Sequence, residues 1–484
     1  NNVIVAGYSV LDFGAKGDGV TDDTHAFREA LSAMRHHGGG VIFVPEGKYL
    51  LTGPLVIYEN VVLRGEWKAP DENGIHGTLL IVKTGKGNEK GSAFITLHRC
   101  AGVKELNIWY PEQDTRKVVA YPWCIHQPGE ENGLVERVTL VNPYLGIQIG
   151  PQANALHYIH EVYGTPLKTG LLFDRCFDIG RLEGIRFQPE IWSRSALPGA
   201  PAIEEITEWT RKNGTALVMY RSDWEYGYDV RVKGYRVGFE ISGSPEFDLE
   251  SGAPEAYPNA QFYDFTLTDC EKAVLVKGAN PYGIAFTRSQ FHGTKVGFET
   301  AETFNSVIQF HDCRFEGQHL LRNNGNGHVA LQHCRIGRGE VVLFDGTVTI
   351  LDSDIEASSL YCSSRVQQAE LHLNPAEMGP VSVQIALDGE RARIDFGAQA
   401  AATRAAIEAS LPELAAALRD AGLTLAGGGV TQHGGQGADA RGDGRREGER
   451  GSTRMGRSES VDAVAAPRPA WRGRAGASGV DLYA

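Results

Sequence analysis

Beyond residue 90 the chain is a series of short stretches in which apolar and polar residues alternate, separated by residues that favour turns. This period of two predicts β-strands. Several stretches share one shape, with a small residue at the same place: Cys270, Ser289, Cys313, Cys334 and Ser353. The steps of 19, 24, 21 and 19 residues between them are typical of a solenoid, whose coils stack about 4.8 Å apart. We therefore predict an all-β solenoid for this part of the chain.

The first 50 residues follow a different pattern. Val10–Phe13 predicts a short strand, and Asp22–His36 predicts a helix that either Asp22 or Asp23 caps. The apolar stripe of this helix is Ala26, Phe27, Ala30, Leu31 and Met34. The Gly-rich segment 14–19 is interpreted as a turn, because Lys16 does not have the spacing of a phosphate-binding loop.

Seven cysteines are present, with no CxxC pair. Cys176, Cys270, Cys313 and Cys334 are predicted at equivalent strand positions, which favours a buried ladder of small side chains over disulfides or metal ligands. His157 and His160 with Glu161 resemble a fragment of a metal site, but the helical HExxH arrangement is absent. We therefore predict no metal site.

Composition divides the chain in two. All 14 lysines lie at or before Lys295, whereas residues 365–484 contain 14 arginines, 25 alanines and only three aromatic residues. The first 364 residues carry a net charge of −12 and the last 120 a net charge of −1, so we predict a boundary near Ser358–Arg365. Residues 433–478, rich in Gly, Arg, Ser and Asp, are typical of a disordered tail.

The overall charge of −13 argues against nucleic acid as a partner. The longest apolar stretches are far shorter than the roughly 18–20 residues of a membrane span. Because the chain starts at Asn1 rather than Met, we expect a processed or truncated product.

VLDFGAKGDGVTDDTHAFREAL (10–31) followed by GGGVIFVPEGKYLL (38–51) resembles the opening of the rhamnogalacturonase/epimerase-like branch of the pectate-lyase superfamily. The resemblance implies a right-handed parallel β-helix over residues 1–361, with an N-terminal capping helix. It also implies a secreted or surface-exposed protein with a polysaccharide or oligosaccharide partner. Members include glycoside hydrolases, lyases, epimerases and phage tail-spikes, so the fold does not select the reaction.

Paired carboxylates are the groups that glycosidases need, and RSDWEYGYDV (221–230) offers the best pair. In an extended strand Arg221, Asp223 and Glu225 would share one face, with the two carboxylates about 6.5–7 Å apart. Asp229 is near enough in sequence to contribute. Arg221 would hold an acidic sugar or keep Asp223 ionised. The alternative interpretation is a solvated strand face.

Residues 187–214 are interpreted as an insertion with an amphipathic helical segment at Ile203–Trp209. It would form the wall of a cleft, with Trp192 or Trp209 stacking on sugar rings; alternatively, Trp209 anchors the insertion to the coil. A second, weaker catalytic candidate is Glu161, with His160 as a substrate-binding neighbour.

The sequence departs from the polygalacturonases, because the Asn-Thr-Asp, Asp-Asp and Gly-His-Gly motifs of that subgroup are not found in register. No cofactor is predicted for hydrolysis. A calcium-dependent lyase would need clustered carboxylates and a nearby base, and Asp223, Glu225, Asp229 and Lys233 provide such a set.

Residues 365–432 predict a small α+β domain: a strand–turn–strand over 371–387, a second edge at Arg391–Phe396 and a helix from Thr403 to Arg419. The pattern Leu-x-Leu-x-Pro-x-x-x-Gly-x-Val-x-Val (371–383), the Ala-rich helix and GLTL (422–425) resemble the C-terminal domain of flagellar hook-length control proteins. That resemblance implies docking on the flagellar export gate and a bacterial cytoplasmic location.

Three hypotheses follow. The chain is a polysaccharide-degrading hydrolase or lyase, a non-catalytic glycan-binding module of the tail-spike kind, or a flagellar export regulator. Because the two segments imply different compartments and differ in residue usage, we expect a chimeric chain, formed by gene fusion or by misassembled sequence data.

Overall fold

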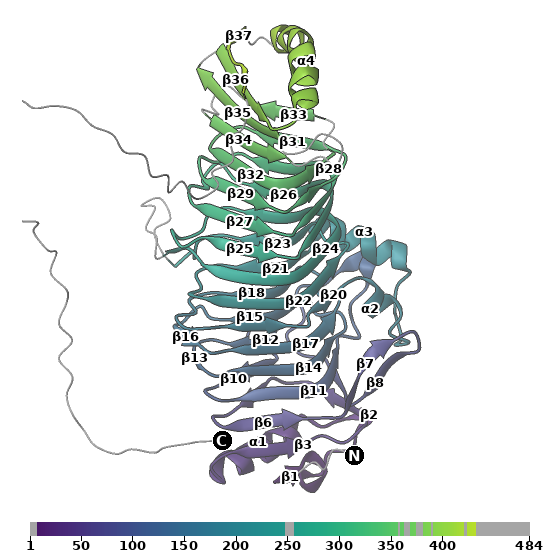
Figure 1. Cartoon of the computed structure of the whole chain (residues 1–484). Helices are drawn as coiled ribbons and strands as arrows, with labels where there is room; N and C mark the ends of the chain where they lie inside the picture. Colours follow the sequence, from purple (N-terminus) through teal and green to yellow (C-terminus); the bar gives the residue numbers. More distant parts are fainter. Residues whose placement is uncertain are drawn as a thin grey trace, which may run out of the picture. The chain divides into compact units, whose positions relative to one another are not determined.

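The computed structural model describes residues 7–246, 256–356, 359–362, 368–373, 381–388, 391–420 and 424–431. The strands of residues 8–373 wind into a parallel β-helix, in which each coil contributes one strand to each of three parallel sheets (Figure 1). The predicted fold class is confirmed. The predicted disordered tail lies outside the described residues.

The first sheet contains the strands that begin most coils. Its first members are β1 (Tyr8–Ser9), β3 (Gly40–Phe43) and β6 (Val61–Arg64), followed by the first halves of three longer strands, β11 (Gly102–Trp109), β14 (Leu134–Leu140) and β17 (Tyr158–Gly164). The sheet continues with β19 (Arg181–Glu183), the first half of β22 (Glu225–Lys233), the start of β24 (Ala260–Val276) and β25 (Ile284–Thr287). Its last members are β27 (Val307–His311), β29 (His328–Gln332), the first half of β32 (Thr347–Ile355) and β34 (Gln368–Leu373).

The second sheet follows the first after a sharp corner. It contains β2 (Asp18–Asp22), β4 (Lys48–Leu51), β9 (Leu79–Val82), the second halves of β11, β14 and β17, β20 (Arg186–Phe187), the second half of β22, the middle of β24, the first halves of β26 (Gln290–Thr300) and β28 (Arg314–Asn323), β30 (Arg335–Ile336) and the end of β32.

The third sheet completes each coil. It contains β5 (Leu55–Ile57), β10 (Ile95–Leu97), β12 (Trp123–Gln127), β15 (Leu145–Ile149), β18 (Thr169–Phe173), β21 (Thr215–Met219), β23 (Val237–Ile241), the end of β24, the second halves of β26 and β28, β31 (Glu340–Leu343) and β33 (Ser359–Cys362).

A single left-handed residue makes the corner between the first and second sheets. From Glu105 to Asp352 the non-glycine corner residues have φ between 44° and 60°: Glu105, Arg137, Glu161, Asp229, Asp264, Arg288, Asp312, His333 and Asp352. The residue after each corner points into the coil, and Ser289, Cys313, Cys334 and Ser353 occupy this position, as the repeat pattern predicted. The left-handed backbone recurs at this corner because two sheets must meet there within one residue.

The predicted equivalence of the four cysteines is wrong in two cases. Cys270 lies between the second and third sheets, and Phe265 occupies the position after the corner residue Asp264 in its coil. Cys176 lies in the turn between the third and first sheets. All four thiols are nevertheless buried, and together with Cys100 and Cys124 they are free.

Helix α1 (Thr24–His36) covers the first coil and buries the five apolar residues that the sequence predicted. Asp23 is its N-cap residue, but the Asp23 side chain accepts from the backbone of Lys16 and Gly17 and closes the Gly-rich turn, so that Asp22 instead accepts from the Thr24 backbone N–H at 3.0 Å. The predicted strand Val10–Phe13 is wrong: these residues form the 3₁₀-helix η1, because Ser9 and Asp12 form a capping box.

Two insertions lie outside the coils. The hairpin β7 (Trp67–Asp71)–β8 (Gly74–Gly77) packs on β14, and the segment between β20 and β21 contains α2 (Glu190–Ser193) and α3 (Ile203–Asn213), which contacts η2 (Thr115–Lys117). The short strands β13 (Glu130–Glu131) and β16 (Asn154–Ala155) pair with each other.

At the other end, β34 pairs in parallel with β32 and antiparallel with β35 (Val381–Asp388). β36 (Arg391–Ala398) continues the antiparallel sheet and also pairs with β37 (Thr424–Gly427) and β38 (Val430–Thr431), and α4 (Ala401–Asp420) contacts these strands. The predicted strands and helix of this segment are confirmed. Within the described residues, none of the helices has both the length and the apolar character needed to cross a membrane.

Candidate functional site

The turn that precedes β22 positions the carboxylates that the sequence singled out. Trp224 adopts a left-handed conformation (φ 61°), and its backbone N–H donates to the side-chain oxygen of Asn259 at 2.6 Å. The Asp223 backbone N–H donates to the Cys176 carbonyl at 2.9 Å. Since β22 begins only at Glu225, the predicted strand face shared by Arg221, Asp223 and Glu225 is wrong.

The turn separates the two carboxylates. Glu225 is 0% exposed and points into the coil, whereas 30% of the Asp223 side chain is exposed. Burial raises the pKa of Asp223, and the charge and hydrogen bond of Arg221 oppose that rise. The Arg221 guanidinium lies 2.8 Å from the Asp223 carboxylate, so the two form one polar unit in which Asp223 reaches the surface and Arg221 is largely buried.

Exposed aromatic rings lie in the same and the neighbouring turns. The Arg221 guanidinium lies 3.8 Å from the centroid of the Phe177 ring, and Phe177 is 43% exposed. Trp224 and Tyr282 are 44% and 78% exposed, with ring centroids 5.9 Å apart and an interplanar angle of 34°. We call Phe177, Arg221, Asp223, Trp224 and Tyr282 the aromatic turn surface. Exposed rings of this kind present apolar faces suited to the C–H faces of sugars.

Sequence reasoning missed Phe177 and Tyr282. They come from turns that are distant in sequence, and the only available signal was a bulky aromatic residue in a turn-rich segment, as in CFDIG (176–180) and NPYG (280–283). Solenoid stacking brings these turns to one edge of the molecule.

A buried polar cluster lies beneath the aromatic turn surface. Glu225 accepts hydrogen bonds from the Ser222 hydroxyl at 2.9 Å and pairs with His157 Nε2 at 3.1 Å. Ligand atoms of His157, Cys176 and Glu225 all lie within 4.8 Å of one another. Glu225 therefore lies inside the coil and does not reach a polysaccharide at the surface.

A second carboxylate near this edge is Asp174, directly after β18. It is 1% exposed, and its Oδ2 accepts a hydrogen bond from the Ser244 hydroxyl at 3.0 Å. Burial raises the pKa of Asp174 to about 6, with the Ser244 hydrogen bond opposing the rise. Sequence patterns do not distinguish this aspartate from exposed ones, because its burial comes from the coils above and below.

Three other predicted site residues lie at the corner between the first and second sheets. Glu161 and Asp229 are left-handed corner residues, and His160 stacks on the ring of Tyr158 at 5.3 Å. Asp229 forms ion pairs with Arg186 and Arg231. Because Asp229 lies four residue steps beyond Glu225, about 13 Å along an extended strand, the structure does not bring the Asp229 carboxylate together with Asp223.

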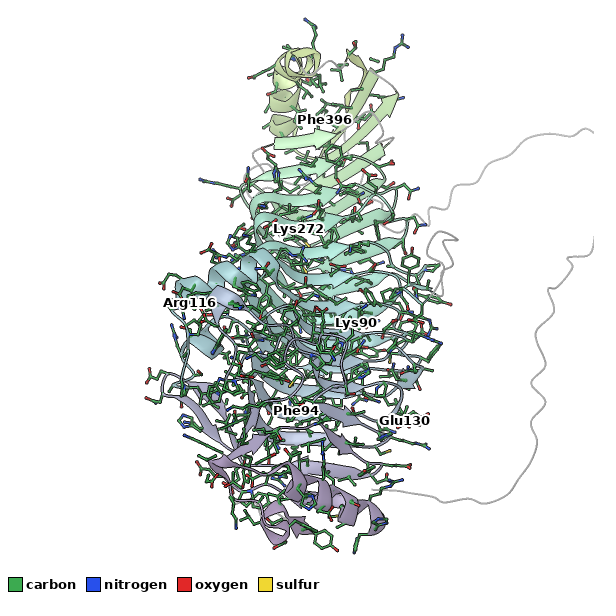
Figure 2. The ribbon with its side chains drawn as sticks, turned by 180° about the vertical axis from the view of Figure 1, so that it is seen from behind. Lys90, Phe94, Arg116, Glu130, Lys272 and Phe396 are labelled. Carbon is green, nitrogen blue, oxygen red and sulfur yellow. The ribbon has the colours of Figure 1, made fainter. Side chains whose placement is uncertain are left out.

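The two predicted sugar-stacking tryptophans occupy different environments. Trp192 is 1% exposed and belongs to a hydrophobic cluster with Trp109, Leu167 and Ile206, so its predicted stacking on a sugar is wrong: it anchors the insertion. Trp209 is half-buried against the same cluster and also lines an open pocket, together with Thr115, Arg116, Glu205, Glu208, Lys212 and Asn213. Figure 2, where Arg116 is labelled, shows the helices that project from the coils on this side.

The four residues proposed for a calcium-dependent lyase do not converge. Glu225 is interior, Asp229 pairs with two arginines at the corner, and Lys233 pairs with Glu190 of α2 at 2.5 Å. The structure therefore gives no support to this calcium set.

Comparison with known proteins confirms both resemblances seen in the sequence. Residues 7–143 match the family described as rhamnogalacturonase A/epimerase, pectate lyase-like, and residues 362–439 match the flagellar hook-length control protein FliK.

Among curated proteins, alginate lyase 7 of Azotobacter vinelandii is 45% identical over 65 residues, which are 12% of this chain and 8% of that protein. Mannuronan C5-epimerase AlgE1 of the same organism is 50% identical over 46 residues, which are 10% of this chain and 3% of that protein. The chain thus spans less than a tenth of the length of these relatives. Among solved structures, the A-module of the Azotobacter vinelandii mannuronan C-5 epimerase AlgE4 is similar, with a TM-score of 0.48, 15% identity and coverage of 73% of this chain and 97% of that one.

Proposed function

We propose that the β-helix is a secreted, carbohydrate-active enzyme that cleaves glycosidic bonds of a polysaccharide at the aromatic turn surface, with Asp223 as its proton-transferring carboxyl group. The matched relatives carry the names of a lyase and an epimerase that act on alginate or mannuronan, which supports a carbohydrate substrate. The proposal concerns residues 7–356.

The observation that carries this proposal is the environment of Asp223. Its carboxyl group reaches solvent, its pKa is raised by burial, and the exposed rings of neighbouring turns are suited to holding a chain of sugars beside it. A carboxyl whose pKa moves toward neutrality is suited to giving and taking protons near pH 7. Arg221, whose side chain is only 10% exposed, keeps Asp223 in place through its guanidinium, and its positive charge beneath the surface favours an acidic sugar there.

The partner of Asp223 depends on the reaction. Hydrolysis requires a second carboxyl group, and Asp178 is an exposed candidate in the turn one coil earlier. Elimination requires a base and a group that neutralises the sugar carboxylate, for which Asp223 and Arg221 suffice chemically.

The test is turnover of a panel of neutral and uronate polysaccharides by the full-length chain and by Asp223→Asn. We expect new reducing ends with at least one polysaccharide, and a loss of about 10²-fold or more in the variant. Ultraviolet absorbance of an unsaturated product would identify elimination, and its absence alongside new reducing ends would identify hydrolysis.

The matched control is Asp264→Asn, which removes the carboxylate of another surface Asp–Arg pair, with Arg288, on a different coil. It should retain wild-type turnover. Failure to cleave any polysaccharide, or equal activity of the wild type and Asp223→Asn, would contradict the proposal. Polysaccharide binding without turnover would instead identify a glycan-binding module.

For the C-terminal segment we propose docking on a component of the flagellar export gate, as the family match at 362–439 suggests. Retention of the full chain by immobilised export-gate protein supports this, and its absence contradicts it. Sequencing one continuous stretch of DNA across residues 340–400 would test whether the two segments form a natural fusion.

A further inference from the structure

Three turns between the third and first sheets bring chemically reactive side chains to one interior point. His157 follows β16, Cys176 follows β18, and Glu225 begins β22. Isolated parallel bridges join Asn154 to Cys176 and Cys176 to Ser222, so the three turns are stacked in register. The convergence is a property of the coil stacking, since the side chains come from positions up to 68 residues apart.

The cluster lies in a fully buried environment. His157, Cys176 and Glu225 are each at most 1% exposed, and the side chains of His157 and Glu225 are 0% exposed. The imidazole stacks on the ring of Phe173 at 5.1 Å with an interplanar angle of 14°, which orients its plane. Burial of a carboxylate is costly unless a cation neutralises it, because the coil interior is poorly polarisable.

One polar atom of this cluster has no hydrogen-bond partner among the described residues. Nε2 of His157 pairs with Glu225, but the buried Nδ1 has no hydrogen-bond partner among the described residues. Gly180 packs tightly against the cluster: a Cβ there would lie 2.2 Å from Glu225 Oε2 and 2.4 Å from His157 Nε2. Only glycine leaves room for these polar atoms.

We propose that His157, Cys176 and Glu225 bind one zinc ion inside the β-helix as three of its four ligands, the fourth position being left to water. Imidazole nitrogen, thiolate and carboxylate are the ligand types that zinc uses in proteins. The ligand atoms lie within 4.8 Å of one another, and the 3.1 Å between Nε2 and Oε1 is close to the roughly 3.3 Å expected for two ligands bound to one tetrahedral ion.

The charges also balance. A thiolate and a carboxylate together neutralise a divalent ion, with the imidazole neutral, so the interior holds no net charge. The Ser222 hydroxyl, which donates to Glu225 Oε2, orients the carboxylate from outside the ligand set. Zinc binding releases two protons to solvent, one from the Cys176 thiol and one from the His157 Nε2 that pairs with Glu225, and no oxidant or reductant takes part.

The position of the site gives it a role. Its ligands belong to the turns that carry Phe177, Asp223 and Trp224, so the ion would hold together the base of the aromatic turn surface. The zinc proposal does not depend on the proposed function, because metal binding is measured without any polysaccharide.

The experiment uses the full-length chain. After unfolding in urea with a chelator and refolding with Co²⁺, the wild type should show a thiolate-to-cobalt charge-transfer band that Zn²⁺ abolishes. After refolding with Zn²⁺ and removal of free metal, elemental analysis should find about one zinc per chain, and Cys176→Ser should lower zinc content at least about tenfold.

Cys270→Ser is the matched control, because Cys270 is equally buried and lies outside the cluster. It should keep both the band and the zinc. If Cys176→Ser fails to refold, the wild-type spectrum decides by itself. A refolded wild type without a thiolate-to-cobalt band, or equal zinc content in the wild type and a folded Cys176→Ser, would overturn the proposal.

Discussion

At the scale of single residues, the environment of each carboxylate sets what it can do. Glu225, Asp174 and Asp223 come from neighbouring turns, yet the first pairs with a buried imidazole, the second with a hydroxyl and the third with the largely buried guanidinium of Arg221. Only Asp223 combines exposure with a raised pKa. For that reason it is our candidate for proton transfer.

Asp174 should make stability depend on pH. Its pKa rises from 3.8 to about 6 on folding, so the folded chain binds the proton more tightly than the unfolded chain. The free energy of unfolding should therefore fall as the pH rises from about 4 to about 6, by at most about 3 kcal/mol from this group. Asp174→Asn, which keeps an acceptor for Ser244, should remove this dependence.

The measurement is urea unfolding of the wild type and Asp174→Asn at several pH values between 4 and 7. The variant should gain in stability relative to the wild type as the pH increases. A constant difference over this range would show that Asp174 keeps its usual pKa in the folded chain.

At the scale of elements, short insertions decide what surrounds the coils. Helix α3 is fixed by Ile206, which is fully buried, and by the Thr210 hydroxyl, which donates to the Gly234 carbonyl at 2.6 Å. Trp192 of α2 packs in the same cluster. The turn before β22 instead leaves Trp224 exposed, because its left-handed backbone turns the chain at that residue.

We expect Trp192 to contribute to stability and Trp224 to contribute to polysaccharide binding. Trp192→Ala should lower the free energy of unfolding by about 3–5 kcal/mol or release the 188–214 insertion to proteolysis, because it leaves a large cavity. Trp224→Ala should change stability by no more than about 0.5 kcal/mol, yet weaken polysaccharide binding about fivefold. Urea unfolding measures stability, and affinity electrophoresis in polysaccharide gels measures binding. A Trp192→Ala variant that weakens only binding, or a Trp224→Ala variant that lowers only stability, would contradict these assignments.

At the scale of the whole described β-helix, stacking is the source of stability. Phenylalanine rings from successive coils contact one another along the interior, and Phe286 contacts Phe239, Phe262, Phe265, Phe291 and Phe310, with centroids 5.1–6.4 Å apart. Each coil buries its apolar side chains against the coils above and below it, so contacts between neighbouring coils, rather than one central core, stabilise the β-helix.

Phe286→Ala should therefore destabilise the middle coils more than the first ones. We expect a cost of about 3–5 kcal/mol, and faster amide exchange in residues 260–315 than in residues 40–110. Hydrogen-exchange mass spectrometry with Phe286→Leu as the volume control measures this. Uniform acceleration over all coils would indicate a single cooperative unit instead.

The sequence by itself determined the solenoid, the helix over its first coil and the α+β segment after it, because these follow from local periodicity and capping that any short window contains. It also pointed to the segment around Asp223. Only the tertiary structure decided that Glu225 and Trp192 are interior, that Cys176 and Cys270 leave the ladder, and that Phe177 and Tyr282 join Asp223. A left-handed residue changes the direction in which the following side chains point, so the alternation of a strand no longer predicts burial there. Contacts between coils also bring together residues that no local sequence pattern relates.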